Sequence, residues 1–266
     1  MPLSTERYIE KCRQYQAPPI TVKKSNRHKD LLMAKKKMQT NPNIHKLWPV
    51  LVLSKRYAQH QKINPKLLEL FYSHRDKEQR TSNTVYASRD DLLEQYPEHA
   101  ELEELTHFIC SGIFEIAREA NTGLWQENDK VKVNLTGLWF QISNDFSFHE
   151  THVHGNCSWS GVYYVQSGES SSSPESHRGK QPNGVTRFYG PHMENMAGGH
   201  GDYGNYYLQD SSWDSYPQDG KLCVFPSYLK HMAFPYNGAE DRVIVSFHAQ
   251  LFNSEGRMGY SYSMNN

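Results

Sequence analysis

The chain has 266 residues, and its 29 basic side chains equal its 29 aspartate and glutamate side chains, so the formal net charge is zero. This length is enough for a substantial hydrophobic core. The balanced charge argues against proteins that depend on bulk attraction to nucleic acid or to a membrane surface.

The four cysteines form no Cys-x-x-Cys pair and are too sparse for a disulfide framework, which favours a reducing compartment. No apolar run approaches the roughly 20 residues of a membrane span. We therefore expect a cytoplasmic protein with neither nucleic acid nor a membrane among its partners. The oligomeric state is left open.

The N-terminal part of the chain is polar. Residues 1–43 include a basic patch between Lys23 and Lys37, and we interpret them as a solvated arm, because a basic run alone is a weak signal for nucleic acid or targeting. The apolar segment Trp48–Leu53 predicts a short buried strand. We place one domain over residues 44–253, followed by a C-terminal tail over residues 254–266.

Residues 44–130 are expected to form a helical support. Asn64 and Pro65 predict a helix start, with the asparagine as N-cap and the proline at the first position. The segment Ser88–Asp91 resembles a capping box and predicts a short helix that ends at Tyr96. A longer helix is predicted over residues 99–120, because five apolar side chains recur there at helical spacing and would pack on a sheet. They are Leu102, Leu105, Ile109, Ile113 and Ile116.

Beyond residue 131 the apolar side chains alternate, which predicts strands. The predicted strands cover residues 131–135, 138–142, 158–165, 185–189, 221–225 and 242–247. Helices followed by many short strands favour a mainly β, α+β fold, a sandwich or barrel with helices packed on one side. Two connections, Ser167–Gly184 and Met193–Pro217, are predicted loops, and the second is long enough to be a lid.

Three histidines in this strand-rich part suggest a metal site. His152 and His154 lie two residues apart, so a strand would present both on one face, and His231 precedes the last strand and could close a set of three ligands. Neutral imidazole binds Fe, Zn, Cu and Ni, so the histidines alone leave the metal open.

Arg242 is the second candidate site residue, because it opens an apolar strand where a buried charge needs a partner. One possibility is an ion pair with a neighbouring acid, such as Asp241 or Glu240. The other is bidentate binding of a carboxylate cosubstrate, which suits the guanidinium geometry.

These residues resemble the 2-oxoglutarate/Fe(II)-dependent oxygenase superfamily, most closely the branch with a His-x-His...His motif. The resemblance covers about residues 45–253 and is carried by three motifs. They are Ser160-Gly-Val-Tyr-Tyr-Val, Phe225-Pro-Ser-Tyr-Leu-Lys-His231 and Arg242-Val-Ile-Val-Ser-Phe-His248. The resemblance implies a double-stranded β-helix, a cupin-like jelly roll, over residues 131–253. It also implies one Fe(II) held by His152 and His231, and 2-oxoglutarate held by Arg242.

The chain departs from the superfamily at the second ligand, which is usually Asp or Glu and is His154 here. Either three histidines bind the metal, or Glu150, one strand step from His152, supplies a carboxylate. Tyr164 and Gln141 are candidates for further contacts with the cosubstrate. Candidates for a lid over the substrate are Tyr203, Tyr206, Tyr207 and Trp213.

The resemblance implies a non-haem Fe(II)/2-oxoglutarate-dependent dioxygenase, an oxidoreductase that uses dioxygen to hydroxylate a small molecule or an amino-acid or peptidyl side chain. A three-histidine cupin-type dioxygenase that does not use 2-oxoglutarate would explain His154 but leave Arg242 without a role. A non-catalytic jelly-roll binding protein and a structural zinc site are further alternatives. The sequence names neither the substrate nor the choice between hydroxylation, desaturation and other oxidations.

Overall fold

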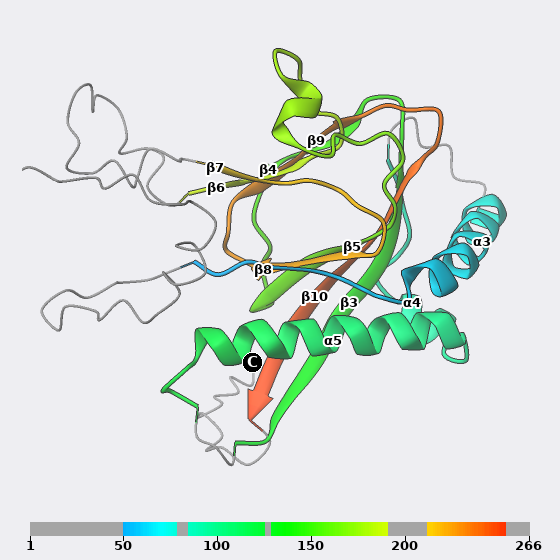
Figure 1. The fold of residues 1–266 in the computed structure, drawn as a ribbon. Helices are drawn as coiled ribbons and strands as arrows, with labels where there is room; N and C mark the ends of the chain where they lie inside the picture. The colour runs from blue at the N-terminus through cyan, green and yellow to red at the C-terminus, as the bar shows by residue number, and fades with distance from the viewer. Residues whose placement is uncertain (1–49, 79–84, 126–128, 191–211, 254–266) are drawn as a thin grey trace, which may run out of the picture. The chain divides into compact units, whose positions relative to one another are not determined.

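Two antiparallel sheets face each other in the computed structural model, which describes residues 50–78, 85–125, 129–190 and 212–253 (Figure 1). The larger sheet has the order β1 (Leu53–Arg56), β8 (Lys221–Pro226), β5 (Trp159–Gln166), β10 (Arg242–Asn253), β3 (Val131–Ser143), β2 (Val85–Ala87). The smaller sheet has the order β4 (Ser147–His152), β9 (His231–Tyr236), β6 (Thr186–Tyr189), β7 (Ser212–Ser215). This pair of sheets is the predicted jelly roll.

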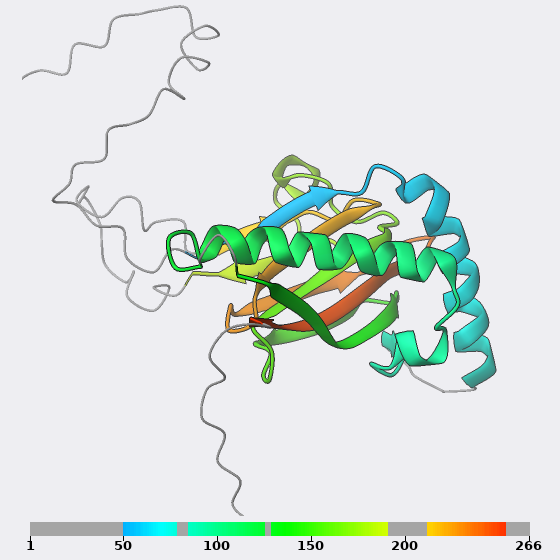
Figure 2. The ribbon, with the colours of Figure 1, turned by 90° about the horizontal axis from the view of Figure 1, so that it is seen from below.

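The helices pack on the outer face of the larger sheet, as predicted (Figures 1 and 2). They are α3 (His60–Glu78), α4 (Leu92–Gln95) and α5 (Ala100–Ala120), with a short 3-10 helix, η1 (Pro174–His177), in the connection between β5 and β6. The predicted apolar stripe of α5 is buried in the core between helices and sheet. Among the described helices, none is long and apolar enough to cross a membrane.

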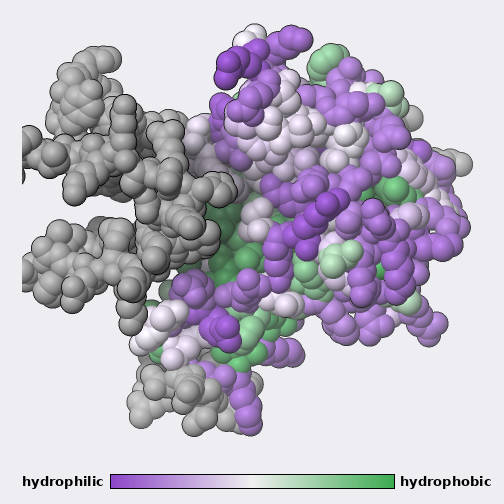
Figure 3. Space-filling view, in the orientation of Figure 1, coloured by the Kyte–Doolittle hydropathy of each residue, from purple (hydrophilic) through white to green (hydrophobic). Residues whose placement is uncertain are grey.

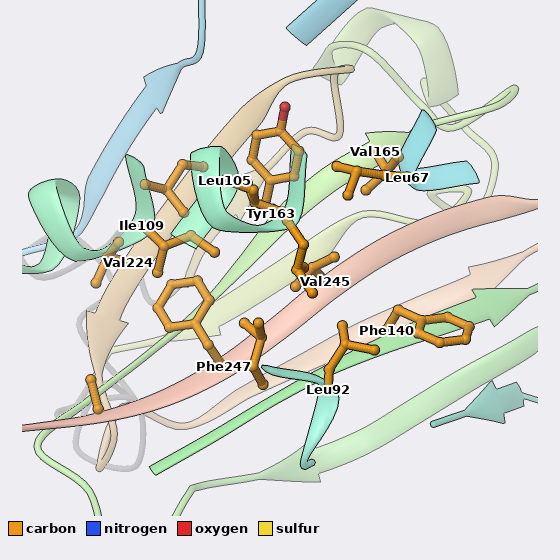
Figure 4. Packing of buried hydrophobic residues seen from close by; sticks show 14 of the residues in the cluster. Leu67, Leu92, Leu105, Ile109, Phe140, Tyr163, Val165, Val224, Val245 and Phe247 are labelled. Carbon is orange, nitrogen blue, oxygen red and sulfur yellow. The ribbon is translucent and has the colours of Figure 1, made fainter. Parts of the chain in front are cut away.

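Strand alternation divides the buried residues into two layers. On β10, Val243, Val245 and Phe247 face the helices and belong to the larger core (Figure 4). The intervening Ile244 faces the space between the sheets. Arg242 lies two positions before Ile244 and His248 lies four positions after it, so their side chains share that inner face.

Two predictions of helix caps are wrong. Helix α3 begins at His60, and Pro65 lies inside it. Asn64 is buried and does not cap the helix. Its amide donates to the carbonyl of Val165 at 2.6 Å and accepts from the hydroxyl of Tyr163 at 2.8 Å. Helix α4 begins at Leu92, with Asp91 rather than Ser88 at the N-cap position. The hydroxyl of Ser88 instead accepts from the backbone N–H of Phe140 on β3 and donates to the carbonyl of Arg89.

Two other boundaries also differ. Strand β1 begins at Leu53, because only Leu53–Arg56 pairs with β8, whereas Trp48 lies outside the described residues. The predicted loop Met193–Pro217 is wrong at its C-terminal end, where Ser212–Ser215 forms β7 and pairs with β6. The loop Ser167–Gly184 contains η1 and is fixed by backbone bonds such as Ser171 N to Asn183 O at 2.8 Å.

The stacked pair Phe71 and Phe140 joins α3 to the larger sheet, with ring centroids 4.3 Å apart and both side chains fully buried. Replacement Phe71→Ala should lower the free energy of unfolding by about 3–5 kcal/mol, measured by urea denaturation. The exposed Phe252→Ala is the control and should change it by about 0.5 kcal/mol or less. Equal effects of the two changes would contradict this account of the core.

Candidate active site

The three predicted histidines meet at one end of the space between the sheets. His152 ends β4 and is the cross-strand partner of His231, which begins β9. His154 lies two residues beyond the end of β4, so the His-x-His pair is not borne by one continuous strand. A backbone bond from His154 N to Ser227 O at 2.9 Å holds it beside the turn between β8 and β9. One potential ligand atom from each histidine lies within 4.8 Å of the others, so the group could hold a metal ion.

Two of these rings are oriented by backbone carbonyls. The Nδ1 atom of His231 lies 2.8 Å from the carbonyl of Leu229, and that of His152 lies 2.5 Å from the carbonyl of Glu150. A carbonyl can only accept, so each Nδ1 carries the proton and each Nε2 keeps a free lone pair. That tautomer is the one a metal-binding imidazole requires.

Burial keeps the imidazoles of His154 and His231 neutral. Burial, with the neighbouring histidines as a smaller cause, lowers the pKa of His154 from its ordinary 6.5 to about 3. Burial also lowers the pKa of His231 to about 4, although the carbonyl of Leu229 opposes this shift. At neutral pH both rings can therefore offer lone pairs without first losing a proton.

The strand β4 is irregular just before the first histidine. His149 pairs with Ala233 and His152 pairs with His231, so three residues on β4 span two on β9, as in a β-bulge. The extra residue reverses the alternation, and it is His149 that lines the same cavity as His152. Glu150 is exposed and does not belong to the histidine group.

Arg242 is 2 % exposed, and its Nε has no hydrogen-bond partner among the described residues. The neighbouring acid Asp241 does not neutralise it, since its carboxylate lies 3.6 Å from Arg75 and accepts from Asn144 at 3.0 Å. No described carboxylate forms an ion pair with Arg242. A buried guanidinium in this state needs a counter-charge that the described residues do not supply.

A single cavity connects Arg242 to the histidines. Its volume is about 80 Å³, well below the roughly 300 Å³ at which pockets for drug-sized ligands begin, so it suits a small ligand. Both sheets contribute to its walls, and none of the described lining residues is Asp or Glu. Its polar lining residues other than the three histidines are Trp139, Gln141, His149, Ser160, Thr186, Arg242 and Ser246.

The two predicted cosubstrate contacts have different positions. Gln141 lines the cavity, and its Oε1 lies 3.1 Å from Nε2 of His149. Tyr164 is fully buried behind the cavity, where its hydroxyl lies 3.1 Å from that of Thr186 and its ring centroid lies 5.4 Å from the guanidinium carbon of Arg242. Burial raises the pKa of Tyr164, so it stays protonated.

An aromatic row continues the metal site across the smaller sheet. His152, His231, Phe188 and Trp213 are successive cross-strand partners, and partners of this kind share a face. The ring of Phe188 lies 5.6 Å from that of His231 and 5.8 Å from that of Trp213. Of the predicted lid residues, only Trp213 can be described, and it lies on a strand. Tyr203, Tyr206 and Tyr207 lie outside the described residues.

A larger hollow of about 400 Å³ lies at the outer end of this row. Apolar surface is visible in this region in Figure 3. The described residues that line it carry no charge. They are Val50, Val52, Ser54, Phe188, Tyr189, Gly190, Ser212, Trp213 and Leu229.

Sequence reasoning missed His149, His248 and Phe188. His248 could have been found, because it shares the even-numbered face of β10 with Arg242. His149 could not, since the bulge that turns it inward leaves no signal in the residue pattern. Phe188 could be found only from the pairing of β6 with β9, because this pairing joins segments more than 40 residues apart.

Comparison with known proteins identifies the class. Residues 137–248 match the family model described as "Putative 2OG-Fe(II) oxygenase". No curated protein matches the chain. This segment is therefore similar to 2OG-Fe(II) oxygenase domains, whose cofactors are Fe(II) and 2-oxoglutarate, and the three-histidine group could hold the metal ion.

Solved structures with a similar fold include a Pseudomonas putida prolyl-4-hydroxylase, with 13% identity, 75% of this chain and 91% of that chain covered, and a TM-score of 0.45. HygX from Streptomyces hygroscopicus, with nickel and 2-oxoglutarate bound, is 11% identical, and the match covers 75% of this chain and 82% of HygX with a TM-score of 0.43. A Trichoplax adhaerens prolyl hydroxylase in complex with a hypoxia inducible factor peptide fragment is 10% identical, and the match covers 74% of this chain and 83% of that chain with a TM-score of 0.45.

The lowered pKa values predict that the metal-free protein loses stability in acid. In the unfolded chain, imidazoles bind protons near pH 6.5, but His154 and His231 resist protonation in the folded protein down to pH of about 3 and about 4. The unfolded state therefore binds more protons in this range, and the free energy of unfolding falls as the pH drops below about 7. Denaturant unfolding at pH 7, 6 and 5 should show a smaller fall for His154→Gln than for the unaltered protein. An identical fall in the free energy of unfolding for the two proteins would contradict the lowered pKa of His154 in the folded state.

Proposed function

We propose that the protein is a non-haem Fe(II)/2-oxoglutarate-dependent dioxygenase that hydroxylates a small molecule or an amino-acid or peptidyl side chain. In this proposal His152, His154 and His231 hold the iron, and Arg242 binds the distal carboxylate of 2-oxoglutarate. The observation that carries it is the buried, unpaired Arg242 in the same cavity as the histidines.

The charges of the cavity support this assignment. Three neutral histidines leave both positive charges on Fe(II), and Arg242 adds a third. The dianion 2-oxoglutarate can chelate the metal at one end and accept a bidentate pair from the guanidinium at the other. No described acidic side chain lines the cavity to compete with it. Glu150, the alternative to His154 as a metal ligand, is a poor candidate, because its side chain is exposed.

The chain's own residues would position and shield the reactants. When bound, Fe(II) and 2-oxoglutarate would supply the oxidation, in which 2-oxoglutarate loses CO2 and takes one oxygen atom of dioxygen to become succinate, and the other oxygen atom is inserted into a C–H bond. Gln141 and His149 would bind polar atoms of the cosubstrate between the metal and Arg242. The fully buried floor around Tyr164 excludes water from the carboxylate end.

The substrate would enter from the side of Phe188 and Trp213. The hollow beyond these residues has a volume within the range of small-molecule pockets, and its described walls are uncharged. We therefore propose a substrate with an uncharged, apolar portion that rests there while its reactive carbon lies near His231. We further propose that the enzyme works in the cytoplasm, where its sparse cysteines stay reduced.

A cosubstrate titration tests the role of Arg242. Anaerobic addition of Fe(II) and 2-oxoglutarate should give a visible metal-to-ligand charge-transfer band. Arg242→Gln should weaken 2-oxoglutarate binding roughly 30-fold or more, because truncating one partner of a buried charge pair costs about 2–5 kcal/mol.

The matched control is Arg187→Gln, since Arg187 is already paired with Asp214 at 2.7 Å and should leave the titration unchanged. Metal binding without a band would favour a cupin-type dioxygenase that does not use 2-oxoglutarate. Equal 2-oxoglutarate affinity in Arg242→Gln would refute the assigned contact.

Succinate release tests catalysis itself. A screen of metabolites and peptides with uncharged apolar groups should find oxygen-dependent succinate formation that is lost in His231→Ala, because that change removes a metal ligand. Equal release from both proteins would refute the metal site. Binding of candidate substrates without succinate release from any of them would favour a non-catalytic jelly roll. Metal analysis after anaerobic purification separates iron from structural zinc.

A further inference from the structure

The three histidines differ in what holds their Nδ1 atoms. For His152 and His231 the partner is the backbone carbonyl two residues earlier, which the fold fixes. For His154 the partner is a side chain, because its Nδ1 lies 3.0 Å from Nε2 of His248. His154 is also the histidine that lies outside the strand ladder. Its ring therefore has the weakest support from the backbone.

His248 is well placed to provide that support. It lies on β10 between β3 and β5, where its neighbours in register are Gly137 and Ser160. Its ring packs edge-on against Trp139, with centroids 4.8 Å apart. A side chain on a strand paired on both sides has a fixed origin, and the contact with Trp139 limits its rotation.

We infer that His248 is a positioning residue for the metal centre, and this inference rests on the proposed function. When His154 binds a metal through Nε2, its Nδ1–H donates to Nε2 of His248. That hydrogen bond favours the tautomer with a free lone pair on Nε2 of His154, which lies 3.2 Å from Nε2 of His231 and so faces the same metal position. Without His248, the ring of His154 could turn or adopt the tautomer with the proton on Nε2, and neither state binds metal.

Through His248, the larger sheet also takes part in the proposed metal site. All three proposed ligands come from the smaller sheet or the residues just after β4. His248 is the link from β10 to the metal, and the same strand carries Arg242 at its other end. One strand would thus set the position of a metal ligand and of the cosubstrate anchor.

A metal titration tests this role independently of turnover. Anaerobic titration with Co(II), followed by its visible absorption, should give a dissociation constant about 10–100-fold higher for His248→Phe, which keeps a ring beside Trp139 but has no acceptor. His248→Gln keeps an acceptor oxygen and should stay within about threefold of the unaltered protein. His177→Phe, another half-buried histidine outside the site, is the matched control and should not change the affinity.

The outcomes separate the two proposals. If the unaltered protein binds no Co(II), both the proposed function and this inference fail. If the unaltered protein binds Co(II), His231→Ala does not, and His248→Phe binds as tightly as the unaltered protein, only the inference fails. If His248→Phe does not fold, nitrogen NMR of the unaltered protein loaded with Zn(II) decides. The Nδ1–H of His154 should be hydrogen-bonded to an unprotonated Nε2 of His248, and a protonated Nε2 of His248 would overturn the inference.

Discussion

The alternation of side chains along β10 is the constraint on which the rest of this structure depends. Odd-numbered residues from Val243 to Phe247 pack under the helices, and even-numbered residues face the space between the sheets. Because a strand has a period of two, a shift in register by one residue would exchange the two sets. The core would then receive Arg242 and His248, and the site would receive valine and phenylalanine. The apolar core therefore fixes the register that the site requires.

Burial acts in opposite ways on the two ends of the cavity. At the histidine end it favours the neutral imidazole, which is the form that binds a metal. At the other end it isolates a guanidinium, which stays charged at any pH in the physiological range and needs a counter-ion. The proposed cosubstrate, 2-oxoglutarate, suits both ends of the cavity, because it is anionic at one end and can complete a metal's coordination at the other.

The sequence predicted the fold where one local pattern dominates. The apolar stripe of α5, the alternation of β3 and the apolar runs of β5, β8 and β10 are local patterns, and the helix and the strands that they predict were confirmed. Asn64 was assigned to the wrong role, because its partners Val165 and Tyr163 lie about 100 residues away. The histidine trio was found from spacing and resemblance, and its metal-binding role stays a prediction. The pairing of His152 with His231, and of His231 with Phe188, depends on strand order, which no short segment encodes.

The bulge in β4 has a consequence for the behaviour of the protein in concentrated solution. Among the described strands, β4 is one of the two edge strands of the smaller sheet, so its free side offers backbone N–H and C=O groups to a strand of another molecule. The extra residue between His149 and His152 breaks the regular spacing of those groups and twists the strand. The irregularity that turns His149 inward thus makes this edge a poor template for edge-to-edge aggregation. The open side of the sheet can remain accessible to solvent without becoming a seed for assembly.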